Sequence, residues 1–353
     1  MKFAVMAGGQ GTRFWPLSRE SRPKQFLAIT GTRTMLQETV VRLSPLARPD
    51  DVYVVCGRQY VDLVHNQLPD LGPQQLIVEP VPRNTAPCIG LAALHLRRTV
   101  GDAVMAVLPA DHSIGQVGEF HEVLGQAAQL AEQGWLVTFG IEPTFPSTGY
   151  GYIQRAGQIA AQNGRRSFQV ARFTEKPPLE QAAKFVASGE YYWNSGIFVW
   201  TIGTIMEQFR RHMPELHQIL LEIDADWDNA EKRESLFSRA PGVSIDFGVM
   251  EKAEKVATIP CSLDWNDVGN WRAVEELLCE DESGIAANTP YVQWGSRDCL
   301  VHSASGKLVA LVGAEELIVV ETPDVVLVCR KDRAEDVKQI VEELRRNGPG
   351  EYL

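Results

Sequence analysis

The first two-thirds of the chain alternates short apolar runs with longer segments of helical periodicity, and this alternation limits the possible folds more than any other feature. The apolar runs are rich in β-branched residues and stop at glycine, proline or polar residues, as buried strands do. The pattern predicts strands at residues 3–7, 52–56, 76–78, 103–108 and 136–139, and helical regions at 34–46, 85–100, 120–132 and 202–223. Alternation of this kind predicts an α/β fold with a mainly parallel sheet flanked by helices.

The later part of the chain has a different pattern. Residues 149–200 form longer and less regular β runs, which indicate an antiparallel insertion covering the site. After about residue 284, short β runs recur at roughly ten-residue intervals, typical of β-solenoid turns or of a small sandwich. An amphipathic helix over residues 332–346 then closes the chain. We therefore predict a large domain at residues 1–284 and a small β-rich domain at 285–353.

Charge and composition argue against several classes of function. The chain has a formal net charge of −11 and a pI of about 5.2, whereas a nucleic-acid or anionic-membrane surface needs a basic face. Its six cysteines are spread singly, without metal-binding spacing, which favours reduced thiols in the cytoplasm. No stretch approaches the roughly 20 apolar residues of a membrane span, and the N-terminal apolar run is too short for a signal peptide.

The densest functional signal is a glycine-rich segment after the first predicted strand, with the sequence GGQGTRFWPLSR at residues 8–19 and PKQFL at 23–27. Glycines let backbone N–H groups approach phosphate oxygens closely, so Gly8, Gly9, Gly11 and Thr12 are candidate phosphate-binding positions. The basic residues in the same segment add charge for an anion. A plain tight turn remains the simplest alternative.

Other phosphate-binding loops fit this segment less well. A Walker loop needs Gly-Lys-Ser/Thr, which is absent, and a dinucleotide fingerprint needs a third glycine where Phe14 stands. A nicotinamide-dependent oxidoreductase is therefore disfavoured. The seven histidines form no zinc-hydrolase pattern, which argues against metal-dependent hydrolysis of that class.

These strings resemble the signature of the sugar nucleotidyltransferases, and further motifs of that family follow in the same chain order. They are RNTAP at 83–87, LPADH at 108–112, FTEKP at 173–177, NSGIF at 194–198 and DWNDVG at 264–269. The resemblance covers about residues 1–280. The remainder resembles the short left-handed β-helix that closes such enzymes, and an apolar face there would allow a homodimer.

The resemblance implies a Rossmann-like fold, a requirement for a divalent metal, usually Mg²⁺, and GTP and mannose 1-phosphate as the substrates. The sugar phosphate would attack the α-phosphorus of the nucleotide directly, so the enzyme chiefly positions two polyanions and neutralises their charge. Two alternatives stay open: the same reaction with another sugar phosphate or nucleotide, and a non-catalytic regulatory subunit. The chain is too short to hold the isomerase domain of longer bifunctional relatives, so we expect it to be monofunctional.

The resemblance also assigns roles to charged residues. Asp111 and Asp267 would hold the metal, a role that suits carboxylates from two separate loops. Arg13 would contact the triphosphate, and Lys24 the phosphate that becomes bridged. Lys176 would grip the sugar phosphate, and the two prolines after it favour an extended backbone. The plainer interpretations are a helix cap, a turn former and solvated surface cations.

Further residues would bind the sugar and the base by the same resemblance. Glu175 and Asn194 would bind sugar hydroxyls, and Gly149 would let the backbone approach the sugar. Asn84 and Thr85 would lie at the guanine, where helix capping is the simpler interpretation, and Gly8 would back the base or ribose. Among neighbouring motif residues, His112 is assigned to structure, and Asp264 is a weaker metal-ligand candidate.

Overall fold

The computed structural model describes residues 1–9, 11–29, 31–162, 165–278 and 281–353. The chain divides into two compact units, each built from segments that are distant in sequence. The first unit comprises residues 1–8, 40–109 and 114–265, and the second comprises residues 9–39, 110–113 and 266–353. The domain boundary predicted at residue 284 remains a prediction.

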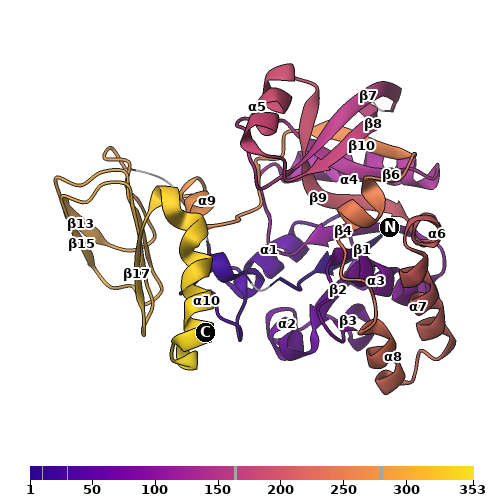
Figure 1. Ribbon diagram of the computed structural model, residues 1–353, viewed down its shortest axis with the longest axis horizontal. Coiled ribbons are helices and arrows are strands. Elements are labelled where there is room, and N and C mark those ends of the chain that lie inside the picture. Colours follow the sequence, from indigo (N-terminus) through magenta and orange to yellow (C-terminus); the bar gives the residue numbers. More distant parts are fainter. Residues whose placement is uncertain (10, 30, 163–164, 279–280) are drawn as a thin grey trace. The chain divides into compact units, whose positions relative to one another are not determined.

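The first unit is organised around a nine-stranded sheet, shown in Figure 1, with the order β3-β2-β1-β4-β9-β6-β10-β8-β7. Strands β3, β2, β1 and β4 are parallel, and so are β6 and β10. Strand β9 lies antiparallel between β4 and β6. The strands are β1 (Lys2–Met6), β2 (Val52–Gly57), β3 (Leu76–Glu79), β4 (Val104–Pro109), β6 (Leu136–Ile141), β7 (Gly151–Gln162), β8 (Arg165–Glu175), β9 (Tyr191–Thr201) and β10 (Val256–Cys261).

The predicted antiparallel insertion corresponds to strands β7, β8 and β9. Strand β7 pairs with both β8 and β9 in antiparallel register. The α/β fold with a largely parallel sheet is thus confirmed, with the sheet made mixed by this insertion. Two short strands complete the chain up to residue 266: β5 (Ser113–Ile114) and β11 (Trp265–Asn266).

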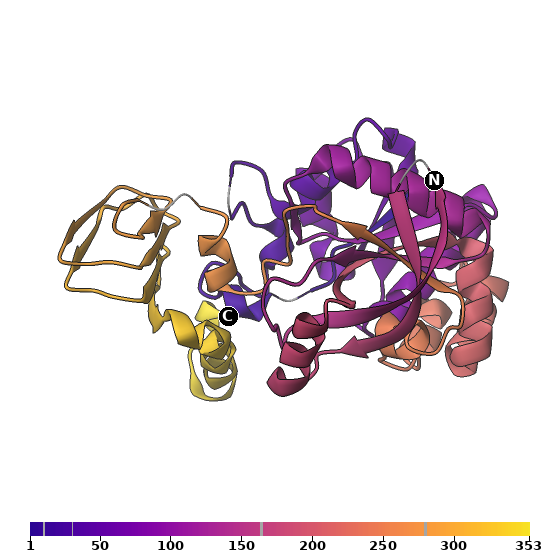
Figure 2. The same ribbon diagram turned by 90° about the horizontal axis from the view of Figure 1, so that it is seen from above.

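Helices lie on both sides of the sheet (Figures 1 and 2). Helices α3, α6 and α7 share one buried core with the sheet, and α4 packs against β6, β9 and β10. The helices up to residue 237 are α1 (Met35–Val41), α2 (Val61–Gln67), α3 (Thr85–Val100), α4 (Val117–Glu132), α5 (Leu179–Ser188), α6 (Ile202–His212), α7 (Pro214–Ala225) and α8 (Ala230–Phe237). Among the described helices, none combines the length and apolar character that a membrane crossing needs.

Local signals account for several helix boundaries. A capping box precedes α1, since the Thr34 amide donates to Gln37 Oε1 (3.0 Å) and the Gln37 amide donates to Thr34 Oγ1 (3.3 Å). The single helical region expected at 202–223 is wrong in one respect. It is two helices, because Pro214 cannot continue α6 and instead begins α7.

The second unit contains a β-solenoid, which decides between the two arrangements left open above. Strands from successive coils pair in parallel, β12 with β14, β14 with β16, and β13 with β15 (Figure 1), and β17 pairs antiparallel with β16. The strands are β12 (Ala286–Ala287), β13 (Tyr291–Trp294), β14 (Leu300–Ser303), β15 (Val309–Val312), β16 (Leu317–Glu321) and β17 (Val326–Arg330). Buried residues of β14, β16 and β17 share a core with Phe14 and Trp271.

Short helices join this solenoid to the glycine-rich segment. The 3₁₀ turn η1 (Thr12–Phe14) lies in that segment, and α9 (Trp271–Glu275) follows the DWNDVG motif. The 3₁₀ segment η7 (Lys331–Asp336) leads into α10 (Val337–Asn347), and α10 packs against η1. The expected closing helix is thus confirmed from Val337 onward.

Candidate active site

The glycine-rich segment forms a tight turn that only glycine permits at one position. Gly11 has a φ of 58°, and a Cβ there would stand 2.6 Å from Cβ of Lys24. Ser18 Oγ donates to the Gly11 carbonyl at 2.6 Å, and this hydrogen bond stabilises the turn. The segment borders a cavity of about 390 Å³, lined by Gly11, Thr12, Arg13, Phe14, Lys24, Asp111, His112, Asp267, Gly269 and Lys338.

Lys24 ties two loops of this cavity together. Its side chain is 5% exposed, and Nζ lies 2.9 Å from Asp111 Oδ2. The same ammonium donates to the carbonyls of Asp267 (2.8 Å) and Val268 (2.7 Å). One buried cation thus brings Asp111 and Asp267, which are 156 positions apart (267 − 111), to the same place.

The turn that carries Asp267 is strained. Val268 has a φ of 47°, an outlier for a β-branched residue, and its side chain is fully buried. The Val268 amide donates to Asn266 Oδ1 (2.7 Å), and the Gly269 amide donates to Asp267 Oδ1 (3.1 Å). Strain of this kind persists where the surroundings over-determine the backbone, and here it aims two carbonyls at Lys24.

Asp111 is held in its charged form. Burial opposes ionisation, but the Lys24 ammonium and His112 outweigh it, so the pKa of the Asp111 carboxyl is lowered from its ordinary value. His112 Nε2 lies 3.9 Å from Asp111 Oδ1. Within the described part of the chain there is no group of three or more His, Cys, Asp or Glu side chains that could hold an ion. Two carboxylates nevertheless fit Mg²⁺, which in nucleotide sites takes its remaining ligands from phosphates and water.

A second cluster of predicted residues lies in the first unit, at the ends of β8 and β9. Asn194 Oδ1 accepts from Thr138 Oγ1 (2.8 Å), and Asn194 Nδ2 donates to Asp246 Oδ1 (3.2 Å). Lys176 Nζ pairs with Glu175 Oε1 at 2.7 Å. Burial and the Glu175 charge raise the pKa of Asp246 to about 6. The cluster is rich in hydrogen-bond acceptors, which suits the hydroxyl groups of a sugar.

Two details of this cluster differ from the sequence-based expectation. Lys176 has a φ of 47°, so its backbone is left-handed rather than extended as the following prolines suggested. Gly151 packs against the sugar-binding candidates, since a Cβ there would collide with Glu175 Oε2 and stand 3.3 Å from Asn194 Cβ. At Gly149 an added Cβ would meet only Ser147, at an ordinary 3.7 Å.

The candidate base-binding residues also lie in the first unit. Asn84 caps α3, because its Oδ1 accepts from the Thr85 amide (2.8 Å), and Thr85 Oγ1 accepts from the Ile245 amide (2.8 Å). Glu79, at the end of β3, is 6% exposed, and its Oε2 lies 3.6 Å from where a Cβ of Gly8 would stand. Burial raises the pKa of Glu79 to about 7.

The sequence analysis missed Glu79, Asp246, Gly151 and Lys338. Only Glu79 carried a usable signal: it directly follows the strand predicted at residues 76–78, and ligands bind at the carboxyl ends of parallel strands. Asp246 stands in a single π-helical turn (Asp246–Met250), a feature frequent at functional sites but not visible in a residue pattern.

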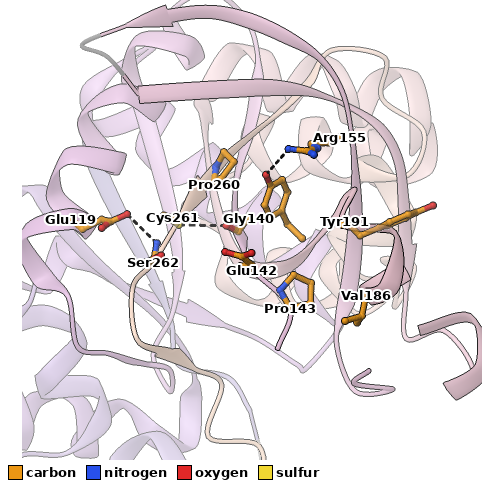
Figure 3. Close-up of a pocket in the computed structure, with 12 residues that line it drawn as sticks. Glu119, Gly140, Glu142, Pro143, Arg155, Val186, Tyr191, Pro260, Cys261 and Ser262 are labelled. Atoms are coloured by element: carbon orange, nitrogen blue, oxygen red, sulfur yellow. Dashed lines mark hydrogen bonds between the residues drawn. The ribbon is translucent and has the colours of Figure 1, made fainter. Parts of the chain in front are cut away.

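A different pocket of about 420 Å³ lies in the first unit, where β6 and β10 end (Figure 3). Its lining includes Glu119, which accepts from the Ser262 amide (3.0 Å), and Arg155, which donates to Tyr192 Oη (3.4 Å). None of the residues singled out from the sequence lines this pocket. The candidate residues lie instead at the cavity at Lys24 in the second unit and, separately, in the two clusters of the first unit.

Comparison with known proteins defines the class. The family model described as "Nucleotidyl transferase" matches residues 2–284, and the model described as "MannoseP isomerase/GMP-like beta-helix domain" matches residues 290–344. The chain therefore belongs to the nucleotidyl transferase family and is an enzyme of that class. The resemblance drawn from the motifs is confirmed, and the β-solenoid is of the kind found in these enzymes.

Individual relatives carry more specific names. The chain is 42% identical to mannose-1-phosphate guanylyltransferase of Klebsiella pneumoniae, over 99% of this chain and 74% of that protein. It is 40% identical to xanthan biosynthesis protein XanB of Xanthomonas campestris pv. campestris, over 98% of this chain and 74% of that protein. Among solved structures, a Thermus thermophilus protein described as mannose-1-phosphate geranyltransferase is 35% identical, with a TM-score of 0.88 over 98% of this chain and 99% of that one.

Proposed function

We propose that the chain transfers GMP from GTP to α-D-mannose 1-phosphate, giving GDP-mannose and pyrophosphate. The guanylyltransferase name of a relative aligned over nearly the whole chain supports the substrates. The single observation that carries the chemistry is the bridge by which Lys24 joins Asp111 and Asp267 beside the glycine-rich turn. This arrangement places two carboxylates that could hold a metal beside the Arg13 cation, where one polyphosphate could bind, as phosphoryl chemistry requires.

The residues divide the substrates between them. Arg13 and the turn at Gly11 bind the triphosphate, and Asp111 and Asp267 would hold Mg²⁺, which supplies charge neutralisation at the reacting phosphate when bound. Lys24 pairs with the Asp111 carboxylate, holds the backbone carbonyl of Asp267, and lines the same cavity. Glu175, Asn194 and Asp246 bind sugar hydroxyls, with Asp246 fixing the orientation of the Asn194 amide. Lys176 contacts the sugar phosphate.

The direct test is a pyrophosphate-release assay over a grid of sugar 1-phosphates and nucleoside triphosphates, with and without Mg²⁺. We expect turnover to be highest with GTP and mannose 1-phosphate and to depend on the metal. Higher kcat/KM with another sugar or base would reassign the substrates, and no turnover with any pair would favour a regulatory subunit of the same fold.

Removal of the Lys176 cation should affect one substrate only. Lys176→Ala is expected to raise the KM for mannose 1-phosphate about tenfold, because a charge-assisted contact to phosphate is lost, and to leave the KM for GTP unchanged. Lys184→Ala is the matched control, since Lys184 is exposed and pairs with Glu180 on α5. Equal effects on both substrates would contradict the assignment.

Glu79 is expected to read the guanine base. A carboxylate accepts from both N1–H and the 2-amino group of guanine, so Glu79→Gln should raise the KM for GTP and bring the kcat/KM ratio of GTP over ITP down about tenfold. Only the ionised carboxyl accepts twice, so the parent KM for GTP should rise as pH falls through about 7, and the variant should lack this dependence.

The control for this experiment is Glu142→Gln. Glu142 directly follows strand β6, as Glu79 ends β3, but it is exposed. If the kcat/KM ratio of GTP over ITP is the same in Glu79→Gln as in the parent, Glu79 does not recognise the base.

A further inference from the structure

The C-terminal helix reaches the cavity at Lys24. Lys338, in the first turn of α10, lines the same cavity as Arg13, Lys24, Asp111 and Asp267. The helix is seated there by its apolar side, since Val337 and Val341 are buried in a core shared with Phe14 of the glycine-rich segment. The sequence alone identifies this helix only as the end of the β-rich domain, yet the helix contributes a cation to the cavity at Lys24.

The cations already assigned to this cavity are largely committed to protein partners. The three hydrogens of the Lys24 ammonium are matched by Asp111, the Asp267 carbonyl and the Val268 carbonyl. Arg13 pairs with Glu335 through Nε at 2.9 Å. For Lys338, by contrast, the described residues provide no ion pair or hydrogen bond to its ammonium.

Charge balance calls for another cation here. GTP brings about four negative charges, and the cavity itself contributes the carboxylates of Asp111 and Asp267. Mg²⁺ offsets two of these charges, and the rest must be met by side chains that can turn to phosphate oxygens. We propose that Lys338 is a substrate-contacting residue that binds the triphosphate of the nucleotide, and that Glu335 is the counter-ion which Arg13 exchanges for the same triphosphate. This inference rests on the proposed nucleotide-transfer function.

The Arg13–Glu335 pair is built for such an exchange. Both side chains are about half exposed, at 45% and 56%, and exposed ion pairs contribute little stability. Glu335 is itself held in place, because its Oε1 accepts from Asn270 Nδ2 at 2.5 Å. Asn270 follows Gly269 of the DWNDVG motif and caps α9. Glu335 therefore keeps Arg13 at the rim of the cavity, and a polyphosphate offers Arg13 a stronger partner.

The decisive variant is Lys338→Met, which keeps the length of the side chain and removes its charge. We expect about a tenfold rise in the GTP Kd measured by calorimetry and in the GTP KM. Pyrophosphate inhibition should weaken by a similar factor, while the KM for mannose 1-phosphate and the melting temperature stay at parent values. Lys338→Arg should restore most of the GTP affinity, because it restores the cation.

Arg346→Met is the matched control. Arg346 lies on the same helix, eight residues (346 − 338) further along and about 12 Å from Lys338 along the helix axis. It pairs with Glu342 and does not line the cavity. Parent-like GTP and pyrophosphate affinities in Lys338→Met, or an equal loss in Arg346→Met, would overturn the role of Lys338.

A second variant tests the exchange. Glu335→Gln removes the competing charge, so the GTP Kd should fall about twofold to threefold, and a Kd that is equal or higher would overturn the counter-ion role. The parent enzyme separates this inference from the proposed function. If the proposed function is wrong, the parent enzyme will show no turnover with GTP and mannose 1-phosphate. If only the roles of Lys338 and Glu335 are wrong, the parent enzyme will still be fully active.

Discussion

Replacement of Asp267 by asparagine is expected to lower kcat about a thousandfold, the order lost when one preorganised charge is removed from a phosphoryl-transfer site. The amide keeps the shape of the carboxyl group, and its oxygen can still accept from the Gly269 amide. The turn should therefore stay folded while its affinity for a divalent ion falls. Pyrophosphate release measured across a range of Mg²⁺ concentrations, together with the melting temperature, checks both parts.

Asp111→Asn should show the same loss of turnover, with some loss of stability as well, because it removes the charge that faces the buried Lys24. Asp264→Asn serves as the control within the same motif. Asp264 accepts from Gln116 Nε2 at 2.7 Å, and its φ of 47° is one that asparagine adopts readily. Near-parent turnover in Asp267→Asn, or an equal loss in Asp264→Asn, would take the two-carboxylate site out of the mechanism.

The elements that the sequence predicts well are those whose signals are local. The capping box at Thr34 and Gln37 and the extent of α3 both follow from residues within one or two turns of each other. The parallel strands follow from apolar runs that stop at glycine, proline or a polar residue. The position of β9 between β4 and β6 does not follow in this way, because strand order depends on pairings across the sheet that no local pattern encodes.

In the candidate site, too, the sequence predicts some features and others are visible only in the structure. The motif residues Arg13, Lys24, Asp111 and Asp267 all line one cavity, so the prediction that distant loops converge there agrees with the geometry. The sequence analysis expected Lys24 to contact a phosphate. In the structure Lys24 is buried and donates to two carbonyls, and this arrangement depends on the strained turn at Val268, which the sequence does not predict. From the sequence, Lys338 is an ordinary surface lysine on an amphipathic helix. Its place in the cavity depends on the packing of α10 against the glycine-rich turn, which no local pattern predicts.

Lys24→Met is expected to lower the free energy of unfolding by about 2–3 kcal/mol, less than the cost of breaking a fully buried pair because the Asp111 side chain is 33% exposed. Methionine fills the space of the aliphatic stem, but the Asp111 carboxylate then faces an apolar group, and the carbonyls of Asp267 and Val268 lose their donor. Turnover should be lost as well, since the two loops proposed to hold the metal are no longer tied together. Urea unfolding gives the stability, and hydrogen exchange over residues 264–271 shows whether the loss begins in this turn.

A double variant separates the structural role of Lys24 from a role in binding phosphate. If the cost comes from an uncompensated buried charge, Lys24→Met combined with Asp111→Asn should recover about 1–2 kcal/mol relative to Lys24→Met alone, because the stranded charge is gone. Activity should not return, since the carboxylate that we propose as a metal ligand has been removed with it. A Lys24→Met protein as stable as the parent, with only its GTP KM raised, would instead make Lys24 a phosphate ligand and remove it as the tie between the two carboxylate loops.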